Sequence, residues 1–389
     1  MKVAVEGCCH GELDAIYGHI QSLETQKRYK VDVLLICGDF EAIRDSHDLK
    51  TMAVPEKYRH MGDFHKYYTG QATAPLLTLV IGGNHEASNH LWELYHGGWL
   101  APNIYFLGHA GCVQVNGVRI AGASGIFKQY DYRSGHFERQ PYDHSAMRSI
   151  CHIREYNVRR LALLSSPDVF LSHDWPSGIT QHGDLDDLLR RKPHHHRNAL
   201  PQPGNPDEIT LGDEGGLFDA PSSGAKVFSA SAAPQNPDEI TLDDEIETVE
   251  PPPPPPRETR FLALDKCLPR RQFLEVVDIP AQQGEAGSPS EGASQHPPVV
   301  LSYDPEWLAI TRAFQPYLSR GRKQETYPDP DSARAAVSRE WDWVHAHVQP
   351  KLGDGWRVDA CQRFARGANS AHQQTEAFAT LLEMENLVR

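Results

Sequence analysis

Four short polar clusters in the first half of the chain carry the side chains that hold divalent metals in proteins. They are Gly7-Cys8-Cys9-His10-Gly11, Gly38-Asp39, Gly83-Asn84-His85-Glu86 and Ser172-His173-Asp174. A carboxylate can bridge two ions, an amide offers a neutral oxygen, and imidazole and thiolate suit borderline and softer ions. Each cluster alone is a weak signal, because single histidines and Gly-Asp pairs are common. The order and spacing of the four together predict a metal site.

The elements that must position these clusters are predicted to be buried strands. Residues 31–36, 76–81 and 169–171 are short runs rich in Val, Leu and Ile, and each ends directly at one of the clusters. Such runs are typical of strands that are covered on both faces. A sheet fixes the loops at its strand ends, and ligands therefore gather there. Residues 1–180 as a whole indicate alternating strands and helices.

Charge is distributed unevenly along the 389 residues. The formal net charge of −14 argues against a nucleic-acid partner when the chain is taken as a whole. However, residues 205–258 hold thirteen Asp or Glu against two Lys or Arg, a net charge of −11. Residues 119–160 hold eight Lys or Arg against four Asp or Glu, a net charge of +4. The acidity is therefore concentrated in one segment, and a central stretch is basic, so the net charge does not exclude a nucleic-acid partner.

Composition divides the chain into five parts. Residues 1–192 form the first part of a core domain, and residues 259–280 return to it as a hairpin of 260–265 and 272–277. Between them, residues 193–258 are acidic and proline-rich, with one heptapeptide at 205–211 repeated at 236–242. This insert is predicted to be disordered because it cannot bury enough apolar surface. Residues 281–299 read as a linker, and residues 300–389 as a small helical C-terminal domain.

Two further features narrow the class of protein. No run of about 18 apolar residues occurs, so no membrane partner is expected. The seven cysteines have no regular spacing. Such an odd, scattered set argues against a disulfide framework and favours a reducing compartment.

The four clusters resemble the calcineurin-like metallophosphoesterases. That superfamily has Asp-x-His, Gly-Asp, Gly-Asn-His-Asp/Glu, a His and then Gly-His-x-His, and the first four blocks match here in order. Cys8 stands where the superfamily has Asp, which makes the chain similar to the lariat debranching enzyme family in particular. Further stretches that resemble this family are 123–127, 130–142, 172–176 and 261–269.

The resemblance implies a fold and a metal site. The fold would be α/β, an αββα two-sheet metallophosphoesterase sandwich with a helical C-terminal domain and the disordered insert. One metal position would be held by Cys8, His10 and Asp39, and the other by Asp39, Asn84 and His173. A thiolate ligand favours a single divalent Fe(II), Zn(II) or Mn(II) over a strict two-metal pair. His85 would protonate the leaving oxygen as general acid, with Glu86 orienting it.

The resemblance also implies a substrate, namely the 2′,5′-phosphodiester branch of excised intron lariats. Residues 127–157 interleave cations with aromatics, which would contact phosphates and stack on splayed bases. The candidate substrate-binding residues are Lys128, Tyr130, Tyr132, Arg133, Tyr142 and Arg154. A solvated loop with a few anchoring aromatics fits the same composition equally well. The family further implies a nuclear location with exchange to the cytoplasm, and protein partners for the C-terminal domain.

One block of the family pattern is missing. Gly-His-x-His should lie between Pro193 and Phe261, and the sequence there lacks it. His182 comes too early, and the triplet at 194–196 follows no strand. The pair at 345 and 347 has the right spacing but lies in a helical pattern. Two alternatives to an active debranching enzyme therefore stay open, a catalytically impaired RNA-binding relative and a metallophosphoesterase for another phosphodiester.

Overall fold

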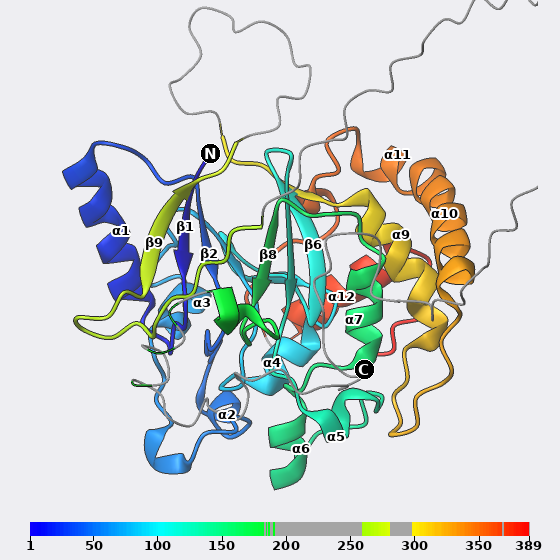
Figure 1. Ribbon diagram of the computed structural model, residues 1–389, viewed down its shortest axis with the longest axis horizontal. Helices are drawn as coiled ribbons and strands as arrows, with labels where there is room; N and C mark the ends of the chain where they lie inside the picture. The colour runs from blue at the N-terminus through cyan, green and yellow to red at the C-terminus, as the bar shows by residue number, and fades with distance from the viewer. Residues whose placement is uncertain are drawn as a thin grey trace, which may run out of the picture.

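The computed structural model describes residues 1–182, 259–280, 298–367 and 369–388, together with positions 184, 186 and 190. The predicted insert at 193–258 lies outside the described residues, as does most of the predicted linker at 281–299. Within the described part, two sheets pack face to face, and helices cover their outer sides (Figure 1).

The first sheet has six strands in the order β4-β5-β3-β2-β1-β9. Strands β1, β2, β3 and β5 are parallel, whereas β4 and β9 are antiparallel to their neighbours. Parallel strands need long crossovers, and helices between the strands supply them. The strand bounds are β1 (Lys2–Glu6), β2 (Val33–Ile36), β3 (Leu77–Val80), β4 (Gly98–Ala101), β5 (Ile104–Phe106) and β9 (Leu274–Asp278).

The second sheet has four strands in the order β10-β6-β7-β8. Its centre is a hairpin whose two-residue turn is Asn116-Gly117, with φ of 48° and 81°. Two positive φ angles match the twist of the flanking strands, and Asn-Gly adopts them at little cost. The strand bounds are β6 (Ala110–Val115), β7 (Val118–Ala123), β8 (Val169–Ser172) and β10 (Leu301–Tyr303).

Helices form the outer layers of the sandwich. On the first sheet lie α1 (Leu13–Lys27) and α3 (Phe64–Thr69), and on the second lie α7 (Glu155–Ala162) and α9 (Pro305–Phe314). At one end, α4 (Ser88–Glu93) and α12 (Ser370–Leu381) pack together beside β4, and α10 (Pro330–His347) packs on α9. The short elements are α2 (Ser46–Leu49), α5 (Gln129–Tyr132), α6 (His144–Ser149), α11 (Gln349–Leu352), η1 (Glu56–Tyr58), η2 (Ile179–His182), η4 (Gln315–Tyr317) and η5 (Val358–Ala360).

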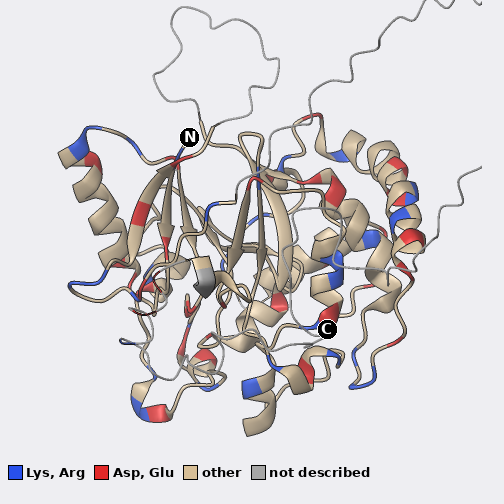
Figure 2. Cartoon of the chain, in the orientation of Figure 1, with Lys and Arg blue, Asp and Glu red and all other residues tan. Residues whose placement is uncertain are grey.

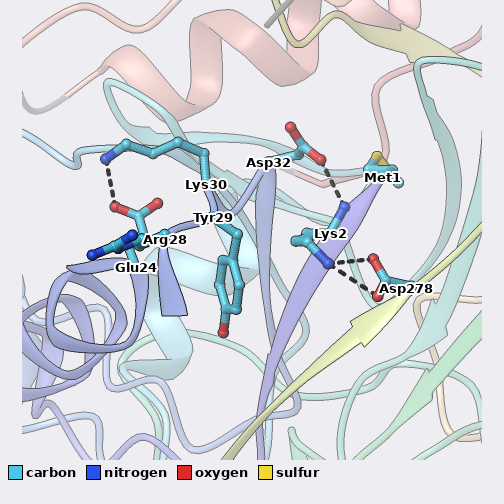
Figure 3. A pocket seen from close by; sticks show the side chains of 8 residues that line it. All are labelled: Met1, Lys2, Glu24, Arg28, Tyr29, Lys30, Asp32 and Asp278. Atoms are coloured by element: carbon cyan, nitrogen blue, oxygen red, sulfur yellow. Dashed lines mark hydrogen bonds and ion pairs between the residues drawn. The ribbon is translucent and has the colours of Figure 1, made fainter. Parts of the chain in front are cut away.

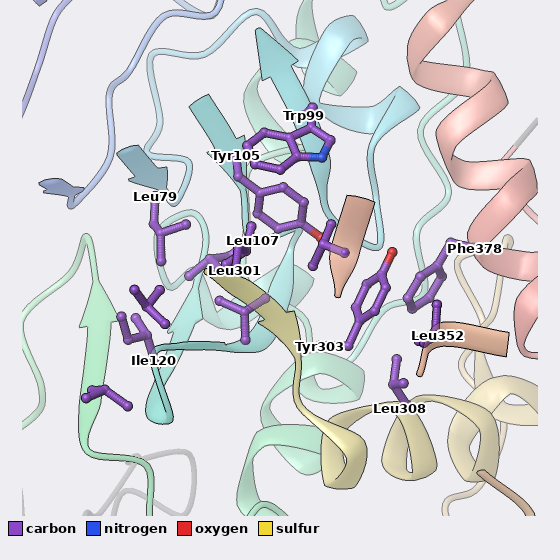
Figure 4. Close-up of a cluster of buried hydrophobic side chains, with 14 of the residues drawn as sticks. Leu79, Trp99, Tyr105, Leu107, Ile120, Leu301, Tyr303, Leu308, Leu352 and Phe378 are labelled. Carbon is purple, nitrogen blue, oxygen red and sulfur yellow. The ribbon is translucent and has the colours of Figure 1, made fainter. Parts of the chain in front are cut away.

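Side-chain alternation along the strands builds two cores at once. In β1, Val3 points into the cluster between the sheets, and Ala4 points into the cluster under α1. Successive residues of a strand face opposite sides, so a sheet covered twice must be apolar throughout. Figure 4 shows the inter-sheet cluster continuing past Leu79 and Ile120 to Phe378 of α12. These layers confirm the predicted αββα sandwich with a helical C-terminal region.

Two segments differ from the sequence-based expectation. Of the predicted late hairpin, residues 274–278 form β9, but residues 260–265 form no strand. That stretch instead leads to a bridge between Lys266 and Cys8 and to a hydrogen bond from the Cys267 N–H to the Cys8 carbonyl, 3.1 Å. The C-terminal region, expected to be helical, begins with β10, which pairs with β6. No helix in the described ranges has the length and apolarity needed to cross a bilayer.

Candidate metal centre

The predicted ligands come together where strands of both sheets end. Cys8 and His10 follow β1, Asp39 follows β2, His85 follows β3, and His173 follows β8 of the second sheet. The three strands of the first sheet are parallel, so their carboxyl ends meet at one edge. The cluster therefore bridges the two sheets at that edge.

Asp39 is the centre of the cluster. Its Oδ2 lies 3.5 Å from Cys8 Sγ and 3.4 Å from His10 Nε2, and its Oδ1 lies 3.4 Å from His173 Nε2. Cys8 Sγ is also 3.1 Å from His10 Nε2. The Asp39 side chain is almost fully buried, which by itself disfavours its charge. The imidazoles of His173 and His85 nevertheless hold the pKa of Asp39 below its usual value.

Hydrogen bonds on the far ring nitrogens orient two of the histidines. The Nδ1–H of His173 donates to the Cys37 carbonyl at 2.8 Å, which leaves Nε2 with its lone pair toward Asp39. His10 Nδ1 lies 3.2 Å from Glu41 Oε1, and its Nε2 likewise points at Asp39 and Cys8. A partner on the second ring nitrogen is the usual device that fixes a metal-binding imidazole.

The backbone around the cluster is strained. His10 and Asp39 have φ of 48° and 46°, the left-handed region that ordinary residues rarely adopt. Strain of this kind persists where the surrounding structure enforces it, and it concentrates at functional sites. Gly83 is required here, since a Cβ at this position would lie 2.2 Å from Asp39 Oδ1. Gly38 is required too, because its Cβ would lie 2.5 Å from His173 Nδ1.

Asn84 and His85 contact Asp39 through their backbone N–H groups, and His85 also contacts it through its ring. Both N–H groups donate to Asp39 Oδ1 at 2.8 Å, and His85 Nδ1 lies 3.3 Å from Asp39 Oδ2. Burial lowers the pKa of His85, and Asp39 offsets this only in part. The His85 ring is about one-third exposed, at 31%. It is thus positioned to meet a substrate oxygen from the solvent side.

Contrary to the expectation from the sequence, Glu86 does not orient His85. It is buried, and its two carboxylate oxygens accept from the N–H groups of Phe40, Glu41 and Gly83 at 2.8–2.9 Å. Burial, together with the charge of Asp39, raises the pKa of Glu86 to about 8. Its role is to tie the loop after β2 to the loop after β3, and so to hold Asp39 in its strained conformation.

Two other carboxylates at this site were not singled out from the sequence. Glu41 belongs to a second group of potential ligands with His10 and His85. Glu6 is fully buried and its Oε1 accepts from the Cys8 N–H at 2.9 Å. Glu41 could have been identified from the sequence, because it lies two residues after Asp39. Glu6 sits inside a strand, where nothing in the pattern separates it from an outward-facing residue.

The donor set fits a divalent metal. Cys8, Asp39 and His173 form one group whose ligand atoms lie within 4.8 Å of one another, and His10, Glu41 and His85 form a second. Burial, and then the charge of Asp39, raises the pKa of the Cys8 thiol well above its usual range. A thiol in that state coordinates only when a cation displaces its proton. The mixture of sulfur, nitrogen and oxygen donors matches a borderline ion better than Mg²⁺ or Ca²⁺.

The predicted substrate-binding residues do not share one environment. Tyr130 is 87% exposed, and Lys128 and Arg133 are exposed beside it. Tyr132 is buried and packs with Phe127, with ring centroids 5.4 Å apart. Lys128, Tyr130 and Arg133 therefore remain placed to contact a substrate, whereas Tyr132 anchors the segment.

Arg154 is a correction to the predicted substrate-binding set. Its side chain is 0% exposed and pairs with the equally buried Glu138 at 2.6 Å. It also donates to the Asp131 and Ser149 carbonyls. A guanidinium in this position cannot reach a phosphate. Tyr142, the remaining member of the set, is half-buried against a buried cluster that includes Trp92 and Ile150.

The candidates for the missing imidazoles that the structure describes, at 182, 345 and 347, belong to neither group of potential ligands. His182 ends the short η2, and the triplet at 194–196 lies outside the described residues. His345 and His347 lie on α10, where each Nδ1–H donates to the carbonyl four residues earlier at 2.9 Å. The helical interpretation of that pair is confirmed.

A separate open pocket of about 660 Å³ lies at the opposite edge of the first sheet (Figure 3). It is formed near the start of β1, where Lys2 pairs with Asp278 at 2.7 Å. Lys30 pairs with Glu24, also at 2.7 Å. These four charged groups are therefore engaged in pairs, and the pocket contains none of the thiol and imidazole side chains of the cluster around Asp39.

Comparisons with known proteins agree with this geometry. Residues 1–219 match the calcineurin-like phosphoesterase family, and residues 256–387 match the C-terminal domain of lariat debranching enzymes. The chain is similar to the lariat debranching enzyme of Arabidopsis thaliana, with 44% identity over 352 residues, 90% of this chain and 76% of that protein. It is 45% identical to lariat debranching enzyme A of Xenopus laevis and 44% identical to the Homo sapiens enzyme, over 88% of this chain in each case. It spans 59% and 58% of the length of those two relatives.

Proposed function

Because the chain belongs to the lariat debranching enzyme family of calcineurin-like phosphoesterases, we propose that it hydrolyses the 2′,5′-phosphodiester branch of excised intron lariats. The products would be a 2′-hydroxyl at the branch and a 5′-phosphate on the linear RNA. The observation that carries the proposal is the convergence of Cys8, His10, Asp39, His85 and His173 at the ends of four strands from two sheets.

The residues of the cluster divide the work of hydrolysis between them. Cys8, His10, Asp39, Asn84 and His173 would hold a divalent ion, which supplies charge neutralisation for the phosphate and an activated water. His85 lies at the exposed side of Asp39, where a leaving 2′-oxygen can receive a proton from its imidazole. Glu86 and Glu41 keep this arrangement in place, through backbone N–H groups and through His10 respectively.

The donor chemistry supports a borderline divalent ion. The thiol of Cys8 replaces a harder carboxylate, which lowers the charge of the site and softens it. We propose Fe(II), Zn(II) or Mn(II) as the resident ion. Metal analysis of protein purified without chelators, followed by reconstitution with each ion in turn, discriminates among the three.

We assign the recognition of branched RNA to residues 127–157, the recognition segment. Its exposed Lys128, Tyr130 and Arg133 supply the cations and the aromatic ring that phosphates and unstacked bases need. We expect branched RNA to bind better than linear RNA of equal charge, and binding to weaken with salt because phosphate contacts release counterions. An RNA processing enzyme of this kind would act in the nucleus, with protein partners at the C-terminal region.

A catalytically impaired RNA-binding protein is the second candidate, and the lack of Gly-His-x-His in the sequence favours it. Changes to the groups around metal ligands lower metal affinity or activity by roughly 10–100-fold, and the loss of a strand that carries ligands should lower them further. We therefore expect the chain to cleave synthetic branched RNA far more slowly than a variant carrying a Gly-His-x-His segment between 193 and 236. Equal rates for the two proteins would show that the missing block is dispensable.

The triplet at 194–196 provides the control for that comparison. Replacing all three histidines with alanine should leave the slow rate unchanged, because they follow no predicted strand. A variant that loses the remaining activity would identify these histidines as substitute ligands. Binding of branched RNA without any cleavage, even after the block is restored, would establish the second candidate.

A further inference from the structure

A turn of the C-terminal region, Ser319–Lys323, is seated directly on the recognition segment. The His136 N–H donates to the Ser319 carbonyl at 2.9 Å, and the Gly135 N–H donates to the Arg322 carbonyl at 3.3 Å. The Arg139 guanidinium donates to the Arg320 carbonyl. Three contacts between segments about 180 residues apart in sequence join the two into one surface.

The fit between the turn and the recognition segment is close. A Cβ on Gly135 would lie 2.4 Å from the Gly321 carbonyl oxygen, so only glycine permits this approach. The Arg322 guanidinium lies 3.9 Å from the centre of the Phe137 ring, a distance at which a cation–π contact stabilises the pair. Ser319 Oγ donates to the Lys323 carbonyl at 2.7 Å and closes the turn on itself.

The outward side of this joint surface is basic. Figure 2 shows Lys and Arg in α6 and in the connection between α9 and α10, on the same lower side of the molecule. The exposed cations are Lys128, Arg133, Arg139 and Arg148 of the recognition segment and Arg322 and Lys323 of the turn. Within the described ranges, the side chains of Lys128, Arg148 and Lys323 make no hydrogen bond or ion pair.

Nearby acids do not cancel this charge. Glu138 is buried and neutralised by Arg154, and Glu155 pairs with Arg159 at 2.6 Å. Asp131, Asp143 and Glu325 then leave three carboxylates against the six exposed cations. Exposed carboxylates near the turn and α6 are Glu325 and Asp143, and Asp143 already caps α6 through the Ala146 N–H. Exposed cations that gather on one side are typical of a surface that binds a polyanion.

We propose that the turn Ser319–Lys323 is part of the substrate-binding surface and contacts phosphates of the RNA strands that flank the branch. This inference rests on the proposed debranching function and deepens it. The C-terminal region would then serve recognition directly, and the substrate would bridge two parts of the chain that are far apart in sequence. Arg322 and Lys323 would supply affinity without base specificity, because phosphate contacts carry no sequence information.

The test measures binding of a synthetic 2′,5′-branched RNA by fluorescence anisotropy across a range of salt concentrations. The Lys323→Glu variant removes a side chain that no fold contact uses, and the Arg322→Ala/Lys323→Ala variant removes both cations of the turn. Each lost phosphate contact should reduce the slope of log affinity against log salt by about 1. The matched control is Lys27→Glu, which reverses the charge of one exposed cation in the last turn of α1.

Thermal unfolding of every variant separates lost contacts from lost structure. We expect Lys323→Glu to unfold like the unaltered chain and yet to bind RNA with a reduced salt slope. A slope equal to that of the unaltered chain and the control, for both turn variants, would overturn the inference and assign the turn to packing alone. If the unaltered chain shows no preference for branched over linear RNA, the proposed function itself fails, and the two failures are thereby distinguished.

Discussion

The metal cluster and the recognition segment are built by different means. In the cluster, each candidate ligand lies in a loop that follows a strand, and the parallel register of β1, β2 and β3 brings three of these loops together. The recognition segment contains only the short helices α5 and α6 and the start of α7, and it is fixed from inside by the Arg154–Glu138 ion pair. It is fixed from outside by the turn Ser319–Lys323.

This difference separates chemistry from recognition in the molecule. Strand ends hold ligand atoms to within fractions of an ångström, as metal chemistry requires. A segment without strands needs buried polar anchors instead, and these use up some of its cations. The composition of such a segment therefore overstates how many charges it offers to a ligand.

Replacing His85 with alanine should have the largest effect, because His85 is assigned to the chemistry of the cluster and not to recognition. Loss of leaving-group protonation is expected to lower the single-turnover cleavage rate of branched RNA by about 10²–10⁴-fold. The affinity for the same RNA should be unchanged, because recognition is assigned to the other region. A variant that binds RNA weakly but cleaves at the normal rate would place His85 in recognition instead.

The Arg154→Met variant should break the anchor of the recognition segment. Removing one member of a buried ion pair leaves Glu138 buried and unpaired, which typically costs about 3–5 kcal/mol. Denaturant unfolding should detect this loss. The matched Arg148→Met variant, at an exposed position of the same segment, should leave stability within about 0.5 kcal/mol. Its salt slope for RNA binding should fall instead. Equal stability of the two variants would contradict the buried anchor.

Acid should destabilise the folded chain through the histidines at positions 96 and 109. Burial lowers the pKa of His96 and of His109 to about 3, so both are neutral in the folded chain. The unfolded chain binds their protons at pH values below about 6.5, so folding loses stability as the pH falls through that value. Each residue contributes at most about 1.4 kcal/mol per pH unit. Unfolding curves at pH 7.5 and 5.5 should show the loss, and His96→Gln should reduce it.

The adjacent thiols of Cys8 and Cys9 should respond differently to replacement with serine, because Cys8 is a candidate metal ligand and Cys9 is a core residue. Cys8→Ser is expected to weaken metal binding by roughly tenfold or more, as judged against the cost of altering groups around a metal. Cys9 is fully buried in the cluster under α1. Cys9→Ser should instead lower stability by about 1–3 kcal/mol and keep the metal content. Metal analysis and unfolding of both variants make the comparison, and unchanged metal content in Cys8→Ser would make Cys8 a core residue.

Sequence reasoning was most successful where a strand leads into a cluster. The runs at 31–36, 76–81 and 169–171 predicted β2, β3 and β8, and the positions of Asp39, His85 and His173 follow from them. The prediction that all three strands are buried is wrong for β8, an edge strand whose Phe170 is 45% exposed. It failed for Arg154, because an arginine among aromatics has the same pattern whether it faces RNA or Glu138. It also overlooked β10 and Glu6, since a three-residue strand and a single buried carboxyl have no periodic signal.

The pairing of β9 with β1 sets an order of events during synthesis. Lys2 and Asp278 are neighbours in the sheet but 276 residues apart in the chain. At about 5–20 residues per second, a ribosome needs roughly 14–55 s to make that stretch. Throughout this time β1 has an open edge, and Cys8 lacks the backbone partner that Cys267 supplies. An open strand edge can pair with other chains, so β1 is a site of possible aggregation until residue 278 emerges.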